Sequence, residues 1–311
     1  MSWFDGFVHH QISLDGLPVS YRCSADWAQR PQAPVLVLLH GFPQTHVMWH
    51  RVAQALARDY RLVMPDLRGY GDSSHQAGDS DHGNYSKRAM AAEVVALLDT
   101  LGVDAFYLCG HDRGGRVAHR LALDHAARVR KLCVIDIAPT LDMYDATDMA
   151  FAQAYYHWFH LTQPMPLPEL MIAGNARAYL HAKLGGWGSQ GLGHIEPQAL
   201  AEYERCFCAP TPQVQGWPAA IHSAAEDYRA GASIDLVHDR LSRQQGEKIA
   251  CDVLVLWGGR GVIERLFSPL ALWQAQCAAQ VRGEAMPAGH FIPEELPAET
   301  AEALRRFMGA H

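Results

Sequence analysis

Residues 106–116 read FYLCGHDRGGR, and this stretch decides the fold. Its apolar start is typical of a buried strand, and its three glycines suit a tight turn followed at once by a closely packed helix. A strand, a sharp turn and a helix in this order form the elbow that presents a catalytic nucleophile in the pattern G-x-S-x-G. Asp112 stands where that pattern has serine. The stretch therefore predicts a carboxylate at the tip of a strand-turn-helix unit.

Three more apolar runs flank the elbow. Residues 34–40 (PVLVLLH) and 61–65 (RLVMP) precede it, and residues 131–136 (KLCVID) follow its helix. Runs without polar alternation indicate strands covered on both faces, and helical spacing at 47–57 and 86–101 separates them. This β-α-β alternation predicts an α/β fold, in which a mostly parallel sheet lies between helices and ligands bind beyond the carboxyl ends of the strands.

The pattern changes after about residue 139. Residues 140–216 are aromatic, proline-rich and helical, with no buried strand among them, and the apolar strand pattern returns at 252–257. We therefore expect an α/β core in two parts, 1–139 and 217–311, with a helical cap formed by 140–216 inserted between them.

Composition narrows the classes of partner. The 311 residues carry a formal net charge of -7 and no basic run, which argues against nucleic-acid binding. The chain lacks the basic-then-apolar layout of a signal peptide and any apolar run long enough to span a bilayer. We expect a cytoplasmic protein whose partner is a small molecule.

The seven cysteines are scattered and form no C-x-x-C pair. This favours reduced, mostly buried thiols. Cys206 and Cys208 could contribute to a metal site, but no matching pair of ligands accompanies them, so we predict no metal.

The candidate chemistry begins with Asp112. A carboxylate attacks carbon by displacement and forms an ester, which a water activated by a histidine must then hydrolyse. His290 stands late in the chain, and Asp136 ends the strand after the elbow's helix. The order Asp112, Asp136, His290 is nucleophile, acid, histidine, as in other elbow enzymes.

Structural roles compete with this interpretation. Asp112 could simply cap the helix that follows it. His290 is one of 18 histidines, and Asp142 and Asp145 lie near Asp136 in the sequence.

Two further features surround the elbow. The backbone N–H groups of Phe42 and Arg113 are candidates for an oxyanion hole, although residues 40–43 could be a simple strand-to-loop turn. Arg113 and Arg116 flank the nucleophile, and guanidinium groups bind carboxylates bidentately, so the pair predicts a substrate with a carboxylate. Alternatively, both arginines could pair with acids at the surface.

With these residues in place, the sequence resembles the fluoroacetate dehalogenases, a group of α/β-hydrolase enzymes related to haloalkane dehalogenases and epoxide hydrolases. The likeness spans nearly the whole chain. It is carried by residues 39–46 (LHGFPQTH), 110–116 (GHDRGGR), 156–158 (YHW), 226–229 (EDYR) and 289–291 (GHF).

The resemblance implies an α/β-hydrolase fold with an eight-stranded, mostly parallel sheet, a helical cap over the elbow, a homodimer and no cofactor. It also implies a halide pocket made by His157, Trp158 and Tyr228. From the residues alone, other aromatic side chains of the cap compete for that role: Tyr155, His160, Tyr179 and Trp187.

The expected activity is hydrolysis of fluoroacetate or related 2-haloacids to 2-hydroxy acids through an aspartyl-ester intermediate. An epoxide hydrolase with the same three residues is one alternative, although a neutral substrate needs no arginine pair. A non-catalytic ligand-binding protein with this fold is a more distant one.

Overall fold

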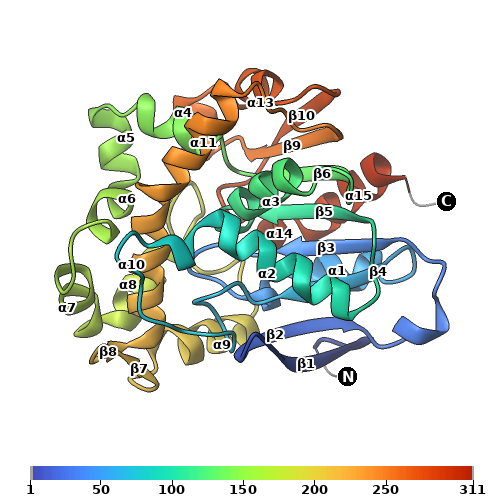
Figure 1. The fold of residues 1–311 in the computed structure, drawn as a ribbon. Coiled ribbons are helices and arrows are strands. Elements are labelled where there is room, and N and C mark those ends of the chain that lie inside the picture. Colours follow the sequence, from blue (N-terminus) through green and yellow to red (C-terminus); the bar gives the residue numbers. More distant parts are fainter. Residues whose placement is uncertain (1–2, 310–311) are drawn as a thin grey trace.

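An eight-stranded sheet forms the centre of the structure, a computed structural model that describes residues 3–309 (Figure 1). Its strands lie in the order β1-β2-β4-β3-β5-β6-β9-β10. The first two pairings, β1 with β2 and β2 with β4, are antiparallel, and the other five are parallel. The strands are β1 (Phe7–Leu14), β2 (Leu17–Ser24), β3 (Val35–Leu39), β4 (Arg61–Pro65), β5 (Phe106–His111), β6 (Val129–Ile135), β9 (Asp252–Gly258) and β10 (Val281–Met286). The expected α/β class and strand number are confirmed.

Helices cover both faces of this sheet. Figure 1 shows α2 and α3 on one face and α1 and α15 on the other. Three helices precede β6 in the chain: α1 (His50–Leu56), α2 (Lys87–Thr100) and α3 (Arg113–Asp124). The helices after β8 are α10 (Ala219–Gly231), α11 (Ile234–Gln244), α12 (Val262–Leu266), α13 (Pro269–Gln276), α14 (Ile292–Glu295) and α15 (Pro297–Met308). Short 3₁₀ turns span Trp27–Gln29, His46–Trp49 and Gly83–Tyr85.

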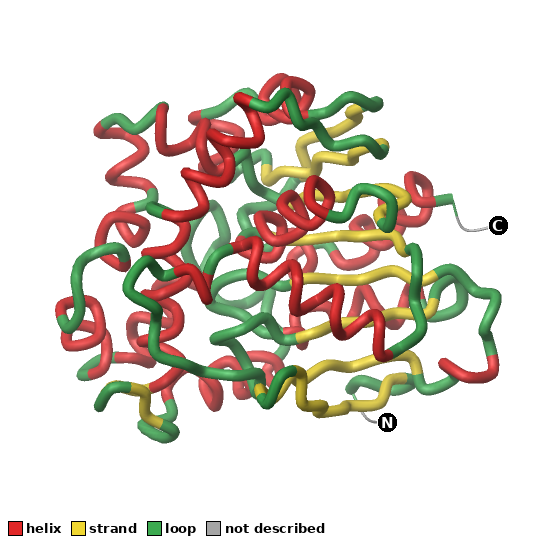
Figure 2. Tube along the Cα trace, viewed as in Figure 1, coloured by secondary structure: helices red, strands yellow, loops and turns green. Residues whose placement is uncertain are grey.

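A helical insertion lies between β6 and β9. Figure 2 shows its helices gathered beyond one end of the strands. The inserted elements are α4 (Thr140–Asp145), α5 (Met149–Ala154), α6 (Tyr156–Leu161), α7 (Leu167–Ala173), α8 (Ala176–Leu184), α9 (Pro197–Cys208) and the two-stranded hairpin β7 (Gln213–Val214) and β8 (Trp217–Pro218). No helix within residues 3–309 combines the length and hydrophobicity needed to cross a membrane.

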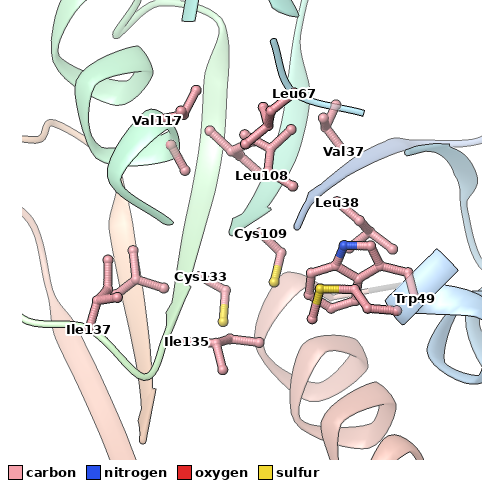
Figure 3. Packing of buried hydrophobic residues seen from close by; sticks show 14 of the residues in the cluster. Val37, Leu38, Trp49, Leu67, Leu108, Cys109, Val117, Cys133, Ile135 and Ile137 are labelled. Carbon is pink, nitrogen blue, oxygen red and sulfur yellow. The ribbon is translucent and has the colours of Figure 1, made fainter. Parts of the chain in front are cut away.

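The central strands are buried on both faces, as their apolar sequences predict. All five residues of β3 are buried, and side chains of β3, β5 and β6 fill the core beside Trp49 (Figure 3). Cys109 and Cys133 are register partners on β5 and β6, and both are free thiols. Burial raises the pKa of Cys109 well above its ordinary value. These two thiols therefore behave as small apolar side chains in the core.

Strand β10 was not identified from the sequence. It reads VRGEAM and is partly exposed along most of its length, because it lies at the edge of the sheet beside β9. An edge strand needs no apolar run on both faces, so its sequence lacks the signal that marks the central strands.

Candidate active site

Asp112 occupies a strained position between β5 and α3. Its φ of 46° and ψ of -116° lie in a region that non-glycine residues rarely adopt. The chain passes so closely here that a Cβ on Gly110 would lie 2.4 Å from the Gly114 oxygen, and one on Gly114 would lie 2.3 Å from the His40 oxygen. The carboxylate makes no capping hydrogen bond to α3, so the geometry does not support the helix-cap interpretation.

The two carboxylate oxygens of Asp112 face different groups. The N–H of Phe42 donates to Oδ1 at 3.0 Å. Oδ2 lies 4.0 Å from Nε2 of His290. A Cβ on Gly41 would lie 2.5 Å from the Cβ of Asp112, so glycine lets the loop after β3 approach the carboxylate.

His290 is held by Asp136, which follows β6. Nδ1 of His290 lies 2.5 Å from Oδ2 of Asp136, and the N–H of Gly258 donates to Oδ1 of the same carboxylate at 2.8 Å. With Nδ1 fixed in this way, Nε2 is the nitrogen that faces Asp112. Asp142 and Asp145 lie elsewhere, and each pairs with an arginine of α11.

The electrostatics of these three residues favour an ionised Asp112. Burial alone would raise the pKa of Asp112, but His290 and Arg116 outweigh it, and the pKa lies below its ordinary value. Burial alone would lower the pKa of His290, but the hydrogen bond and charge of Asp136 outweigh it, and this pKa lies above its ordinary value. The structure thus brings the carboxylate of Asp112, the imidazole of His290 and the carboxylate of Asp136 into one line.

Arg113 and Arg116 are both buried beside this line, and their partners differ. The guanidinium of Arg113 donates to both carboxylate oxygens of Asp227, from Nε and Nη2, at 2.8 Å each. Arg116 donates from Nη1 to Thr140 Oγ1 at 2.9 Å and to the Ala138 oxygen at 3.2 Å. Neither arginine is at the surface, although Arg113 does pair with an acid.

Three aromatic side chains from α6 and α10 meet above the elbow. His157 and Tyr228 have ring centroids 5.4 Å apart, and Trp158 lies 6.4 Å from Tyr228. All three are buried. Within residues 3–309, neither Nδ1 of His157 nor Oη of Tyr228 has a hydrogen-bond partner. The residues that the resemblance assigned to a halide pocket therefore do lie together.

Two of the four competing aromatic residues also reach the site. The Trp187 ring lies 4.7 Å from His157 and 5.2 Å from His290, and Tyr155 lies 5.5 Å from His157. Tyr179 instead stacks on Phe207. Nothing in the sequence around Trp187 predicts its contact with His290, because a loop between α8 and α9 delivers it.

Asp227 is the residue whose part in the site the sequence did not reveal. It lies within the EDYR motif, but only the fold shows that it meets Arg113, Lys87 and Tyr70. Among residues 3–309, no three His, Cys, Asp or Glu side chains lie together as the ligands of a metal ion would.

Comparisons with known proteins show the family to which the chain belongs. A family model for the alpha/beta hydrolase fold matches residues 34–166. The chain is 44% identical to a fluoroacetate dehalogenase from a Burkholderia species, covering 98% of this chain and 95% of that protein. It is 30% identical to a soluble epoxide hydrolase from Corynebacterium, covering 96% of each. A crystal structure of an alpha/beta hydrolase from Nostoc superposes with a TM-score of 0.91 at 47% identity, covering 99% of this chain and 100% of that one. The chain belongs to the α/β-hydrolase superfamily, in the family that includes fluoroacetate dehalogenase.

Proposed function

We propose that the protein is a hydrolytic dehalogenase that converts fluoroacetate or a related 2-haloacid to a 2-hydroxy acid and halide. The residues that would carry the reaction are Asp112, His290 and Asp136. The cap, residues 140–216, would cover them and keep water away from the first step.

In the first step, Oδ2 of Asp112 attacks the α-carbon. A carbon–oxygen bond forms, the carbon–halogen bond breaks and the halide leaves with the bonding electrons. The arrangement favours Oδ2 because Phe42 already holds Oδ1. The lowered pKa of Asp112 keeps its carboxylate ionised and therefore nucleophilic.

In the second step, water attacks Cγ of the aspartyl ester while Nε2 of His290 takes its proton. Asp136 stabilises the resulting imidazolium. The negative charge on Oδ1 is received by the Phe42 N–H, with the Arg113 N–H as the second donor of the oxyanion hole. The Cγ–Oδ2 bond then breaks, and His290 returns its proton to Oδ2, which leaves as the hydroxyl oxygen of the 2-hydroxy acid. The water oxygen remains on Asp112 and restores its carboxylate.

The observation that carries this proposal is the pair of buried guanidinium groups beside the nucleophile. A buried arginine is costly unless it meets an anion. Arg113 already pairs with Asp227, whereas no carboxylate among the described residues forms an ion pair with Arg116. An anionic substrate with its α-carbon over Asp112 would supply the anion that Arg116 lacks. A neutral epoxide would leave that positive charge unused.

The departing halide would be received by His157, Trp158 and Tyr228. Fluoride leaves carbon poorly, so a dry site must offer hydrogen-bond donors where the negative charge develops. The partnerless Tyr228 Oη and His157 Nδ1 are suited to this. Burial lowers the pKa of His157 well below its ordinary value, so its ring is neutral and has a single N–H.

One observation favours the epoxide hydrolase as a second candidate. Tyr155 and Tyr228 are both buried near Asp112, whose charge raises the pKa of each hydroxyl in addition to the larger effect of burial. Both hydroxyls therefore stay protonated, and either could donate to an epoxide oxygen as its ring opens.

A single assay separates the candidates. The purified protein is incubated with fluoroacetate, chloroacetate or styrene oxide, and halide and diol are measured. We expect halide release from the two acids and no diol. Diol without halide would establish the epoxide hydrolase, and neither product would favour a non-catalytic binding protein. Asp112→Ala is the blank for background hydrolysis.

A further inference from the structure

Arg113 is held in one orientation by a carboxylate that lies outside the proposed catalytic residues. Asp227, on α10, is fully buried and accepts from Nε and Nη2 of Arg113 at 2.8 Å each. Nη2 also donates to the backbone oxygen of Asp227 at 2.7 Å. Three bonds to one residue fix the plane of the guanidinium, whose centre lies 4.2 Å from the Tyr228 ring centroid.

Asp227 is in turn fixed by two other elements. The hydroxyl of Tyr70 donates to its Oδ2 at 2.6 Å, and the ammonium of Lys87 pairs with its Oδ1. Lys87 also lies 3.4 Å from Asp235. Burial would raise the pKa of Asp227, but Arg113 and Lys87 lower it far below its ordinary value, so the carboxylate is ionised. Arg113 therefore has a full counter-charge at hydrogen-bond distance.

Arg116 has no such partner. No carboxylate among the described residues forms an ion pair with it, and its bonds go to neutral acceptors: Thr140, Ala138 and Met143. Its Nε is buried and lacks a hydrogen-bond partner in the described part of the chain. The guanidinium lies 4.6 Å from the Trp158 ring centroid. Arg116 is only 4% exposed, so water screens its charge weakly.

We propose that Asp227 is a positioning residue that orients Arg113 and neutralises its charge, so that Arg116 supplies the net positive charge by which the site selects anionic substrates. This inference rests on the proposed function. The two arginines thus have separate tasks: Arg113 offers a fixed hydrogen-bond donor, and Arg116 offers a charge.

The two arginines differ in this way because the electric field of the Arg113–Asp227 ion pair and that of the single charge on Arg116 depend differently on distance. An ion pair such as Arg113–Asp227 acts on a third group as a dipole, whose effect falls off faster with distance than that of a single charge. A single buried charge acts at full strength in a medium of low dielectric constant. A substrate carboxylate should therefore depend mainly on Arg116 for its preference over a neutral group of similar shape.

The test compares chloroacetate with 2-chloroacetamide, which replaces the carboxylate by a neutral amide. For each variant, kcat/KM is measured from chloride release, with Asp112→Ala as the blank, and the acid-to-amide ratio is taken. We expect Arg116→Gln to lower this ratio about 100-fold and Arg113→Gln to lower it no more than about 10-fold.

Two variants make the comparison specific. Arg120→Gln removes another buried arginine of α3, which bonds to Asp239 and Ser242 outside the site, and should leave the ratio unchanged. Asp227→Asn keeps the shape but removes the counter-charge. It should raise KM for chloroacetate about 10-fold with little change in kcat, and in its background Arg116→Gln should lower the ratio less than it does in the unmodified protein.

The outcomes are distinguishable. Equal losses of the ratio in Arg113→Gln and Arg116→Gln would overturn the inference and leave the proposed function standing. An unmodified protein that releases no chloride from either compound would instead refute the proposed function. If Asp227→Asn fails to fold, as judged by circular dichroism, the two arginine variants still decide the question.

Discussion

At the scale of single residues, the surroundings of Asp112 divide its two oxygens between two tasks. Oδ1 is held by the Phe42 N–H, and Oδ2 faces His290 across 4.0 Å. That distance is too long for a hydrogen bond, which leaves Oδ2 free to attack a substrate. His290 then has to act on water and not on the carboxylate itself.

This division predicts a trapped intermediate. His290→Asn removes the base for the second step and leaves Asp112 able to perform the first, so incubation with chloroacetate should add one carboxymethyl group to the protein. Intact-mass spectrometry measures the increase, and peptide mapping should place it on Asp112. The double variant with Asp112→Ala should stay unmodified. An unchanged mass in His290→Asn, under conditions where the unmodified protein turns over, would count against the covalent route.

The residues that the sequence could predict are those that stand directly after strands. Asp112 and Asp136 follow apolar runs that are easily recognised, and parallel strands bring their carboxyl ends to one edge. Asp227 and Trp187 could not be assigned in this way, because their contacts with Arg113 and His290 arise only when the insertion and α10 fold back over the sheet.

At the scale of elements, the elbow depends on backbone contact between β3, β5 and α3. The first turn of α3 lies so close to the end of β3 that only a hydrogen fits at Gly114. The same requirement explains why this region was predictable: a close backbone approach leaves its mark as glycine. Strand β10 has no comparable mark, because an edge strand tolerates polar and exposed side chains.

Gly114→Ala should therefore destabilise the protein and impair the site. The new Cβ would lie 2.3 Å from the backbone oxygen of His40, so α3 must shift away from β3. We expect a loss of about 1–3 kcal/mol in the free energy of unfolding, measured by urea denaturation, together with lower kcat. Gly174→Ala is the matched control: no atom lies within 4 Å of its Cβ position and its φ is -69°, so stability should stay the same or rise slightly. Equal effects of the two substitutions would contradict this account of the elbow.

At the scale of the whole molecule, a buried acid joins three parts that are distant in sequence. Gln44, which follows β3, donates from Nε2 to a carboxylate oxygen of Glu294 on α14 at 2.5 Å. Tyr203 of α9 in the insertion donates to its other oxygen at 3.0 Å. Burial raises the pKa of Glu294 from an ordinary 4.5 to about 8, so the folded protein retains a proton there at neutral pH.

The raised pKa predicts how stability depends on pH. At pH values below about 4.5, Glu294 is protonated in both the folded and the unfolded chain. Between about 4.5 and 8 only the unfolded chain ionises, so rising pH should lower the free energy of unfolding by up to about 1.4 kcal/mol per pH unit from this group. The side chain in Glu294→Gln stays neutral at every pH. The free energy of unfolding of this variant should therefore rise relative to that of the unmodified protein between about pH 4.5 and 8, as measured by urea denaturation at several pH values. Glu284→Gln makes the same substitution at an exposed residue of β10 and serves as the control. If the free energy of unfolding of Glu294→Gln depended on pH just as that of the unmodified protein does, the raised pKa of Glu294 would be contradicted.

The strained backbone at Asp112 has one more consequence. Its positive φ is maintained by Gly110, Gly114 and the packing of α3 beneath the sheet, and none of these contacts involves the carboxylate. The neighbouring glycines and α3 therefore determine where the side chain at position 112 lies, and the residue at that position determines only its chemistry. A substitution at this position can change the attacking atom without changing the backbone that orients it. Enzymes with unrelated reactions can therefore diverge from one ancestral backbone at the elbow.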